Sequence, residues 1–255
     1  GLVEKHGLEF TILVLVSILV GGAVEIIPTV VITEKVPAVI TEEMIAEDPA
    51  LAETAKWIQQ PYSPLELAGR DVYVAEGCYN CHSQMIRPFR HEVLRYGEYS
   101  RMEESLYDHP FQWGSKRTGL DPARVGGKYD NLWHYLHLMD PRQTSPASNM
   151  PAYEHFKTKT LDPAVTAARM NAQAKLGVPY AAEDLALAEE RYLSQAQLVA
   201  DDLKSKDVDV DPMSEMVAVI AYLQRLGRGP QPLSPEPVTA AAGGAVGPAT
   251  DSGRE

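Results

Sequence analysis

Apolar residues dominate the start of the chain and then give way to polar sequence with short helical patterns. Residues 8–27 read LEFTILVLVSILVGGAVEII, a run of twenty residues. At about 1.5 Å per residue, such a helix just crosses a hydrocarbon layer of about 30 Å. Its ionisable members, Glu9 and Glu25, lie near the two ends. A carboxylate there reaches the headgroups or, for Glu25, a partner subunit. The pattern predicts a single transmembrane helix in a lipid bilayer.

The charges around this run predict its orientation. Lys5 and His6 precede it and acidic residues follow it. The positive-inside rule therefore places the short N-terminus in the cytoplasm and everything after Pro28 outside. A cleaved secretory signal is the alternative, with the small residues at 21–23 as its cleavage site. The run is longer than an ordinary signal core, which favours the membrane anchor.

Two later segments have the marks of well-defined amphipathic helices. The first begins at residues 63–66, Ser-Pro-Leu-Glu, with Ser as N-cap, Pro at the first helical position and Glu closing a capping box. Apolar residues recur at helical spacing up to residue 75, and Gly77 ends the run. The second is opened by Asp211-Pro212, covers residues 213–226 with one apolar side and stops at Gly227.

The other segments are weaker patterns. Residues 29–61 read as a spacer with short helical stretches at 42–46 and 49–59, and residues 83–127 and 140–151 read as loops. Further helices are expected at 128–138, 162–176 and 181–203, the last of them solvated. Residues 228–255 are rich in Pro, Ala and Gly, which predicts a disordered tail.

Together these patterns predict a mainly α chain. Its parts are a cytoplasmic stub with the transmembrane helix (1–28), a linker (29–61), a helical domain (62–227) with a helical insertion at about 157–210, and the tail (228–255). The 255 residues are 45% hydrophobic, enough for a packed core. The net charge of -12 argues against nucleic-acid binding, which needs a basic face. No Gly-rich loop of the kind that holds phosphates is present either.

The candidate chemistry lies in residues 78–82, Cys-Tyr-Asn-Cys-His. This spacing is typical of covalent haem attachment, in which each sulfur adds to one vinyl group and the histidine lies beneath the iron. The chain has only these two cysteines, so a four-thiolate zinc or iron-sulfur site is excluded. We therefore expect one haem c, attached at Cys78 and Cys81, with His82 as an axial ligand of its iron.

Three alternatives use the same cysteines. A thioredoxin-like redox pair needs a βαβ setting, and the flanks show no Val/Ile-rich strand pattern. A zinc site with two distant histidines, or a structural disulfide, leaves the position of His82 unexplained. Haem attachment accounts for all three residues of the motif.

An electron-transfer haem usually has a second axial ligand that closes the iron to oxygen. Met150 is the first candidate, because Pro151 forces it out of the helical region into an extended loop that can present a thioether. It is also far enough along the chain to reach the opposite side of the haem. Met139 is the next candidate, and His134 or His137 comes third.

Two further features suggest contacts. Arg87, Arg90, Lys116 and Arg117 form a basic cluster in an acidic chain. Such a cluster can neutralise haem propionates, dock on a partner or simply belong to a solvated loop. Residues 110–114, Pro-Phe-Gln-Trp-Gly, suggest a buried contact with another subunit.

Four blocks carry a closer resemblance: CYNCHSQMIRPFR at 78–90, YDHPFQWGSKRTG at 107–119, ARVGGKYDNLWH at 123–134 and SNMPAY at 148–153. With the N-terminal helix and GGAVEIIP at 21–28, they resemble the mono-haem subunit II (FixO/CcoO) of cbb3-type cytochrome c oxidases. The resemblance covers nearly all of residues 8–227. Leu120-Asp121-Pro122 departs from the family's usual Pro-Asp-Leu.

The resemblance implies a subunit of the bacterial inner membrane with a periplasmic haem domain. That domain would have a class I cytochrome c-like fold, in which the helices at 64–75 and 213–226 cross and enclose the haem. Cys78 and Cys81 would be the thioether residues, His82 the proximal ligand and Met150 the distal ligand. The implied partners are a haem-copper catalytic subunit, a second c-type cytochrome subunit and a donor cytochrome c.

The implied function is electron relay within a terminal oxidase that reduces oxygen and pumps protons. The chain itself has no membrane helix with several histidines, so we expect no oxygen-reducing site on it. A free-standing membrane-tethered cytochrome c and a non-redox assembly subunit are the alternatives.

Overall fold

The computed structural model describes residues 5–36, 40–108 and 111–228. Within these ranges the chain is helical, with two isolated β-bridges and no strands. The predicted disordered tail lies outside the described residues except for Arg228. The α-helices are α1 (Gly7–Lys35), α2 (Glu42–Glu47), α3 (Leu51–Ala55), α4 (Pro64–Ala75), α5 (Arg90–Tyr96), α6 (Asn131–Met139), α7 (Pro163–Lys175), α8 (Ala182–Ala186), α9 (Ala188–Lys204) and α10 (Glu215–Arg225). Four 3-10 helices join them, η1 (Cys78–Asn80), η2 (Met102–Ser105), η3 (Pro141–Gln143) and η4 (Glu154–Lys157).

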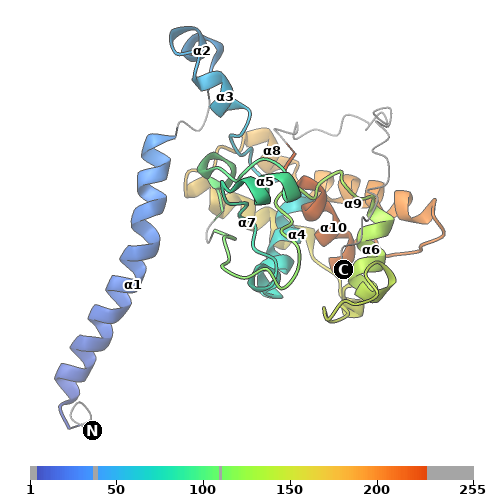
Figure 1. Ribbon diagram of the computed structural model, residues 1–255, viewed down its shortest axis with the longest axis horizontal. Helices are drawn as coiled ribbons and strands as arrows, with labels where there is room; N and C mark the ends of the chain where they lie inside the picture. The colour runs from blue at the N-terminus through green and yellow to red at the C-terminus, as the bar shows by residue number, and fades with distance from the viewer. Residues whose placement is uncertain (1–4, 37–39, 109–110, 229–255) are drawn as a thin grey trace.

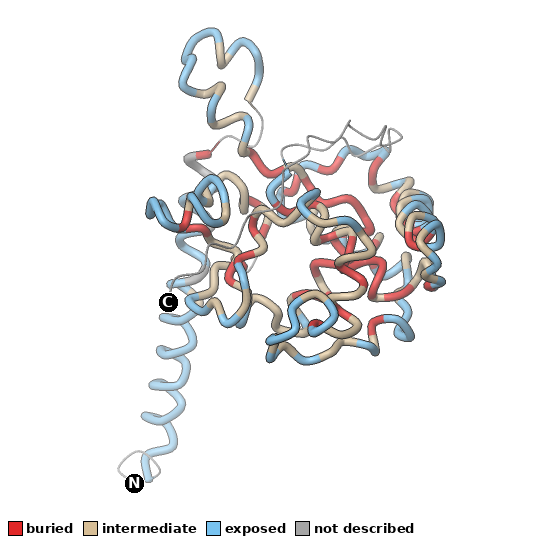
Figure 2. Tube along the Cα trace, turned by 45° about the vertical axis from the view of Figure 1, so that its right-hand side comes forward, coloured by how far each residue is buried: buried red, intermediate tan, exposed pale blue. Residues whose placement is uncertain are grey.

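The apolar N-terminal run forms α1, which stands apart from the other helices as a rod (Figure 1). From Gly7 to Val31 the residues of described burial are exposed, apart from the partly buried Gly22 (Figure 2). The segment Gly7–Pro28, with a mean hydropathy of 2.5, is long and apolar enough to cross a membrane. A single membrane anchor is therefore indicated by length and composition.

The spacer predicted at 29–61 is partly helical. The apolar span ends at Pro28 as expected, but the helix α1 itself continues to Lys35, so the first residues of the predicted spacer are helical. A proline is tolerated inside such a helix where neighbouring groups satisfy the freed carbonyl. The two short helical stretches expected in the spacer are present as α2 and α3.

α4 and α10 form the centre of the helical domain. α4 begins as predicted, with Pro64 in its first turn and the Glu66 carboxylate accepting a hydrogen bond from the backbone N–H of Ser63 over 2.9 Å. At Gly69 a Cβ atom would lie 1.9 Å from the carbonyl oxygen of Ala218 in α10. Only glycine allows this approach, so the apolar faces of α4 and α10 meet in direct backbone contact.

The start of α10 differs from the prediction. Its N-cap is Ser214, whose side chain accepts a hydrogen bond from the N–H of Val217, and the helix runs from Glu215 to Arg225. Asp211-Pro212 lies in the turn before it. Ser and Asp are both favoured N-cap residues, so Ser214 and Asp211 were both possible starts of this helix, and the structure uses Ser214.

α9 is a core helix, which corrects the prediction that residues 181–203 form a solvated helix. Tyr192, Ala196 and Leu203 are completely buried, and α9 packs against α4, α6, α7 and α10. The chain also breaks at Leu187, between α8 and α9. Alanines on the buried side allow close packing while adding little to the apolar pattern, which explains why the sequence looks solvated.

The segment 83–127 contains helices that the sequence did not predict. α5 is short and highly charged, with no apolar period, and its C-cap is Gly97, whose positive φ of 109° favours glycine. η2 follows at Met102–Ser105. α6 and α7 match their predictions to within three residues at each end, and α6 is capped by the Asp130 carboxylate, which accepts from the N–H of Trp133.

Candidate functional site

Residues 77–82 form one turn directly after α4. Gly77 has a left-handed backbone (φ 69°), which glycine adopts without strain and which turns the chain out of the helix. η1 follows, and the N–H of His82 donates to the carbonyl of Cys78 over 2.9 Å. The local fold thus brings Cys78, Cys81 and His82 onto one turn.

The two sulfurs are not bonded to each other, which counts against a structural disulfide. Cys81 is exposed, whereas Cys78 is half-buried against a cluster that includes Tyr73 and Tyr222. Burial, and then the charge of Glu76, raise the pKa of Cys78 to about 12. A redox-active Cys-x-x-Cys pair needs a thiol with a lowered pKa, so this environment also counts against the thioredoxin-like alternative.

A backbone carbonyl fixes the imidazole of His82. Nδ1 of His82 lies 2.7 Å from the carbonyl oxygen of Leu120. Because a carbonyl only accepts, Nδ1 carries the proton, and Nε2 keeps its lone pair for a metal. The ring also fills the space above Gly119, where a Cβ would lie 2.0 Å from Cε1 of His82. This cradle and this tautomer fit an axial ligand of haem iron.

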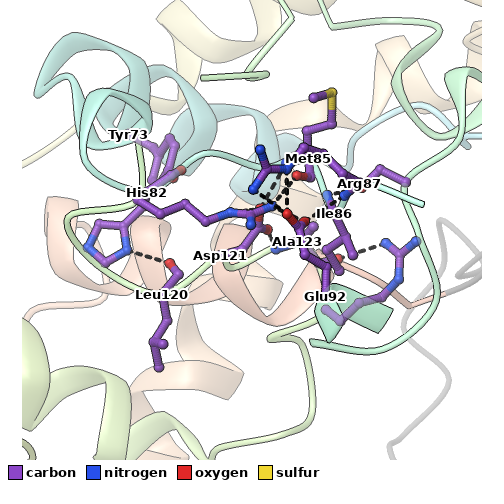
Figure 3. A network of polar contacts seen from close by, with 12 residues as sticks. Tyr73, His82, Met85, Ile86, Arg87, Glu92, Leu120, Asp121 and Ala123 are labelled. Carbon is purple, nitrogen blue, oxygen red and sulfur yellow. Dashed lines mark hydrogen bonds and ion pairs between the residues drawn. The ribbon is translucent and has the colours of Figure 1, made fainter. Parts of the chain in front are cut away.

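The loop that carries Leu120 is held by buried polar contacts (Figure 3). The carboxylate of Asp121 accepts hydrogen bonds from the N–H groups of Met85, over 3.1 Å, and Ala123, over 2.9 Å. It also accepts from the guanidinium of Arg117, which bonds to Glu92 over 2.7 Å. We call Glu92, Arg117 and Asp121 the loop network. It joins the segment after His82 to the loop that orients the His82 ring.

The charges of the loop network are compensated inside the protein. Glu92 is only 2% exposed, yet hydrogen bonds from Arg117 and Arg87 hold the pKa of its carboxyl down at about 2. Burial raises the pKa of Asp121, while its backbone donors and Arg117 act in the opposite direction. Buried charges are stable when paired in this way, and removing one partner leaves the other without compensation.

The basic cluster expected from the sequence is divided in the structure. Arg87 and Arg117 both pair with Glu92, so their charges are used within the chain. Arg90 and Lys116 are exposed. Two of the four charges are therefore paired within the chain, and the three interpretations of the cluster stay predictions.

The described part of the aromatic segment, residues 111–114, has partners within its own chain, and Pro110 lies outside the described residues. The rings of Phe111 and Trp113 stack at a centroid distance of 4.7 Å. Phe111 packs against a small cluster made by Val36, Ile58 and Leu106. This cluster attaches the segment after α1 to the helical domain.

Met150 lies in the loop between η3 and η4. Burial raises the pKa of Tyr153, three residues later, and the charges of Cys78, Glu76 and Cys81 raise it further, so this loop lies near the turn 77–82. Its N–H bonds to Oγ of Ser148 over 3.2 Å, and its side chain packs against the core cluster built from α4, α6, α9 and α10. Met139 and Met213 pack against the same cluster, so burial alone does not separate these thioethers. Met150 as the distal ligand stays a prediction.

The two histidines of α6 have distinct surroundings. His137 stacks on Trp133 at 4.8 Å, and its Nδ1 lies 2.6 Å from Oγ1 of Thr144. Burial lowers the pKa of His137, and the nearby charge of His82 lowers it further. His134 is 2% exposed, and burial lowers its pKa to about 4. Of the two histidines, His137 is the one that the electrostatics place near His82.

A zinc site at the cysteines has no support in the described part of the chain. One group of three metal-ligating side chains has its ligand atoms within 4.8 Å of one another, and it consists of Glu76, His155 and Glu215. Neither cysteine belongs to it. The zinc alternative for Cys78 and Cys81 therefore lacks its histidine partners.

Sequence reasoning missed the residues that orient His82. Leu120 acts through its backbone, which has no side-chain signature, and Gly119 is recognisable only once the His82 ring is placed above it. The acidic members of the loop network looked like ordinary loop charges. One feature of the sequence pointed to this loop. Residues 120–122 read Leu-Asp-Pro where the family that the chain resembles usually has Pro-Asp-Leu.

Comparison with protein families gives one assignment. The family model described as "Cytochrome C oxidase, mono-heme subunit/FixO" matches residues 1–229. No curated protein matches the chain.

Proposed function

The chain belongs to the FixO family of mono-haem cytochrome c oxidase subunits, and from this membership we propose that it relays electrons within a cbb3-type oxidase. Bound haem c supplies one-electron exchange at its iron, while the protein sets its orientation and surroundings. Cys78 and Cys81 hold the haem covalently. His82 ligates the iron through Nε2, and Met150 supplies the distal thioether.

The hydrogen bond between His82 and Leu120 carries this proposal. It fixes the protonated nitrogen, orients the ring and makes Nε2 a stronger electron donor, as partners of ligating histidines generally do. The loop network supports that carbonyl from the next residue along the chain. A disulfide or a scaffold without haem gives no reason for a glycine beneath the His82 ring.

The remaining parts of the proposal concern placement and partners. α1 anchors the chain in the bacterial inner membrane with its N-terminus in the cytoplasm, and the helical domain at 62–227 is periplasmic with a class I cytochrome c-like arrangement. The domain receives electrons from a donor cytochrome c or from a second c-type cytochrome subunit. It passes them to the haem-copper catalytic subunit, where oxygen is reduced. The exposed apolar surface of α1 supports the membrane placement.

Purification from native membranes tests the proposal. We expect the chain to co-purify with a haem-copper subunit and to keep its c-type optical spectrum after denaturation, because the thioether bonds are covalent. A haem-bearing chain that purifies alone would indicate a free-standing carrier. A colourless chain that still assembles with the oxidase would indicate a non-redox assembly subunit.

A further inference from the structure

Three metal-ligating side chains meet close to the haem-attachment turn but outside it. Glu76 ends α4, His155 lies in η4, and Glu215 is the first residue of α10. Nε2 of His155 is 3.2 Å from a carboxylate oxygen of Glu76, and one ligand atom from each of the three residues lies within 4.8 Å of the others. We call these residues the Glu-His-Glu cluster.

The backbone holds the cluster in place. The N–H of Glu215 donates to the carbonyl of Lys159 over 2.9 Å, and a β-bridge joins Thr160 to Ser214. η4 follows the Met150 loop within the same short segment. The three ligands therefore sit on elements that the fold has already fixed, which lowers the ordering cost of binding.

One carboxylate oxygen of the cluster lacks a donor. Oε2 of Glu215 is fully buried and makes no hydrogen bond within the described part of the chain. The nearest cation, Nζ of Lys159, is 3.9 Å from it and 3.7 Å from the Glu76 carboxylate, which is too far for a hydrogen bond to either. Burial raises the pKa of Glu215, as expected for a carboxylate with incomplete compensation. A buried oxygen in this state is poorly satisfied by the protein alone.

The donor set determines which cation the cluster suits. Calcium and magnesium use oxygen ligands, whereas zinc and its neighbours in the first transition row combine imidazole nitrogen with carboxylate oxygen. Three protein ligands with a fourth position left for water form a common zinc arrangement. His155 is 39% exposed, which gives an ion in solution access to the cluster.

We propose that Glu76, His155 and Glu215 form a binding site for a first-row transition-metal dication, in which Lys159 acts as the competing internal cation. A bound ion bridges the end of α4, which leads into the attachment turn, to η4 and to the start of α10. It thereby links the segment before Cys78 to the segment after Met150. The site is independent of the electron-relay role.

The test uses the full-length, haem-loaded chain in detergent, stripped with a chelator and then titrated with zinc chloride against a chromophoric chelator. We expect one zinc ion per chain with a nitrogen and oxygen shell at about 2.0–2.2 Å by X-ray absorption. A sulfur shell at about 2.3 Å would instead place the zinc on unmodified cysteines and overturn the proposal. His155→Gln should lower the zinc affinity by at least about tenfold. Loss of a residue that only hydrogen-bonds to a metal ligand already lowers metal affinity by about that much, so loss of a ligand itself should cost no less.

Two variants separate metal binding from a purely structural cluster. Glu215→Gln should lose zinc affinity while its zinc-free melting temperature does not fall, because it removes a buried carboxylate that lacks a donor. Lys159→Met should bind zinc more tightly than the wild type, because the competing ammonium is gone. His91→Gln, at an exposed histidine outside the cluster, is the matched control and should bind like the wild type. Equal zinc affinity of the wild type, His155→Gln and Lys159→Met would overturn the proposal.

Discussion

The replacement Gly119→Ala tests whether the His82 ring is held as an axial ligand. The added Cβ would meet three ring atoms of His82, with Cε1 at 2.0 Å and both nitrogens at 2.6 Å. All three distances are far below van der Waals contact, so either the ring or the loop must move. A displaced ring cannot keep its 2.7 Å hydrogen bond to Leu120.

The cost follows from these two effects. Overpacking a tight site costs about 1–3 kcal/mol. Loss of the hydrogen bond adds about 0.5–1.5 kcal/mol. Gly119→Ala should therefore lower the free energy of unfolding by about 1.5–4.5 kcal/mol. Because the imidazole then loses the partner that makes it a strong donor, the haem midpoint potential should rise.

The assay combines denaturant unfolding with a spectroelectrochemical titration of the purified haem-loaded chain. Leu120→Ala is the matched control, since its side chain is 52% exposed and the backbone carbonyl remains. This variant should stay within about 0.5 kcal/mol of the wild type and keep its potential. A Gly119→Ala protein with wild-type stability, spectrum and potential would refute the assignment of His82.

Three further predictions follow from other parts of the structure. Met150→Ala should abolish the weak near-infrared sulfur-to-iron band while the protein still folds, whereas Met139→Ala should keep this band. The reverse result would identify Met139 as the distal ligand. Glu92→Gln should change the acid unfolding profile followed by circular dichroism. The folded-state pKa of Glu92 is about 2 against an ordinary 4.5, so this residue contributes stability that is complete above pH 4.5 and is lost as the pH falls through about 2. The variant should lack that component, and an unchanged profile would contradict the pairing. Gly69→Ala should lower the melting temperature, with a cost of about 1–3 kcal/mol or more, because the new Cβ meets the Ala218 carbonyl at 1.9 Å; a wild-type melting temperature would contradict the close helix contact.

The sequence predicted the elements that have strong local signals. The capping box at residues 63–66 gave the start of α4, and the apolar run gave α1. The start of α10 was predicted at Met213 and lies at Glu215, because Ser214 rather than Asp211 is the N-cap. α5 was missed since a seven-residue charged helix has almost no period. A strong local signal therefore decides where a helix forms, whereas a charged segment without a period, such as α5, depends on tertiary contacts.

The site was predictable to the extent that its chemistry resides in side chains. The spacing of the two cysteines and the histidine identified the turn at 77–82, whereas the carbonyl that orients His82 belongs to a loop about forty residues later in the chain. Likewise, the sequence does not show that Arg87 and Arg117 both pair with Glu92. Long-range pairing of this kind has no signature in a single sequence.

The burial of α9 determines how small a working version of this protein can be. Tyr192 and Leu203 are buried in the core of the domain. A shortened protein that lacks residues 157–210 would therefore have a cavity in its core and lose stability. The predicted insertion at 157–210 is therefore part of the hydrophobic core of the domain. A soluble fragment for crystallisation or electrode work therefore has to begin before Ile58, which is buried in a cluster with Leu106, and retain the chain up to Arg228.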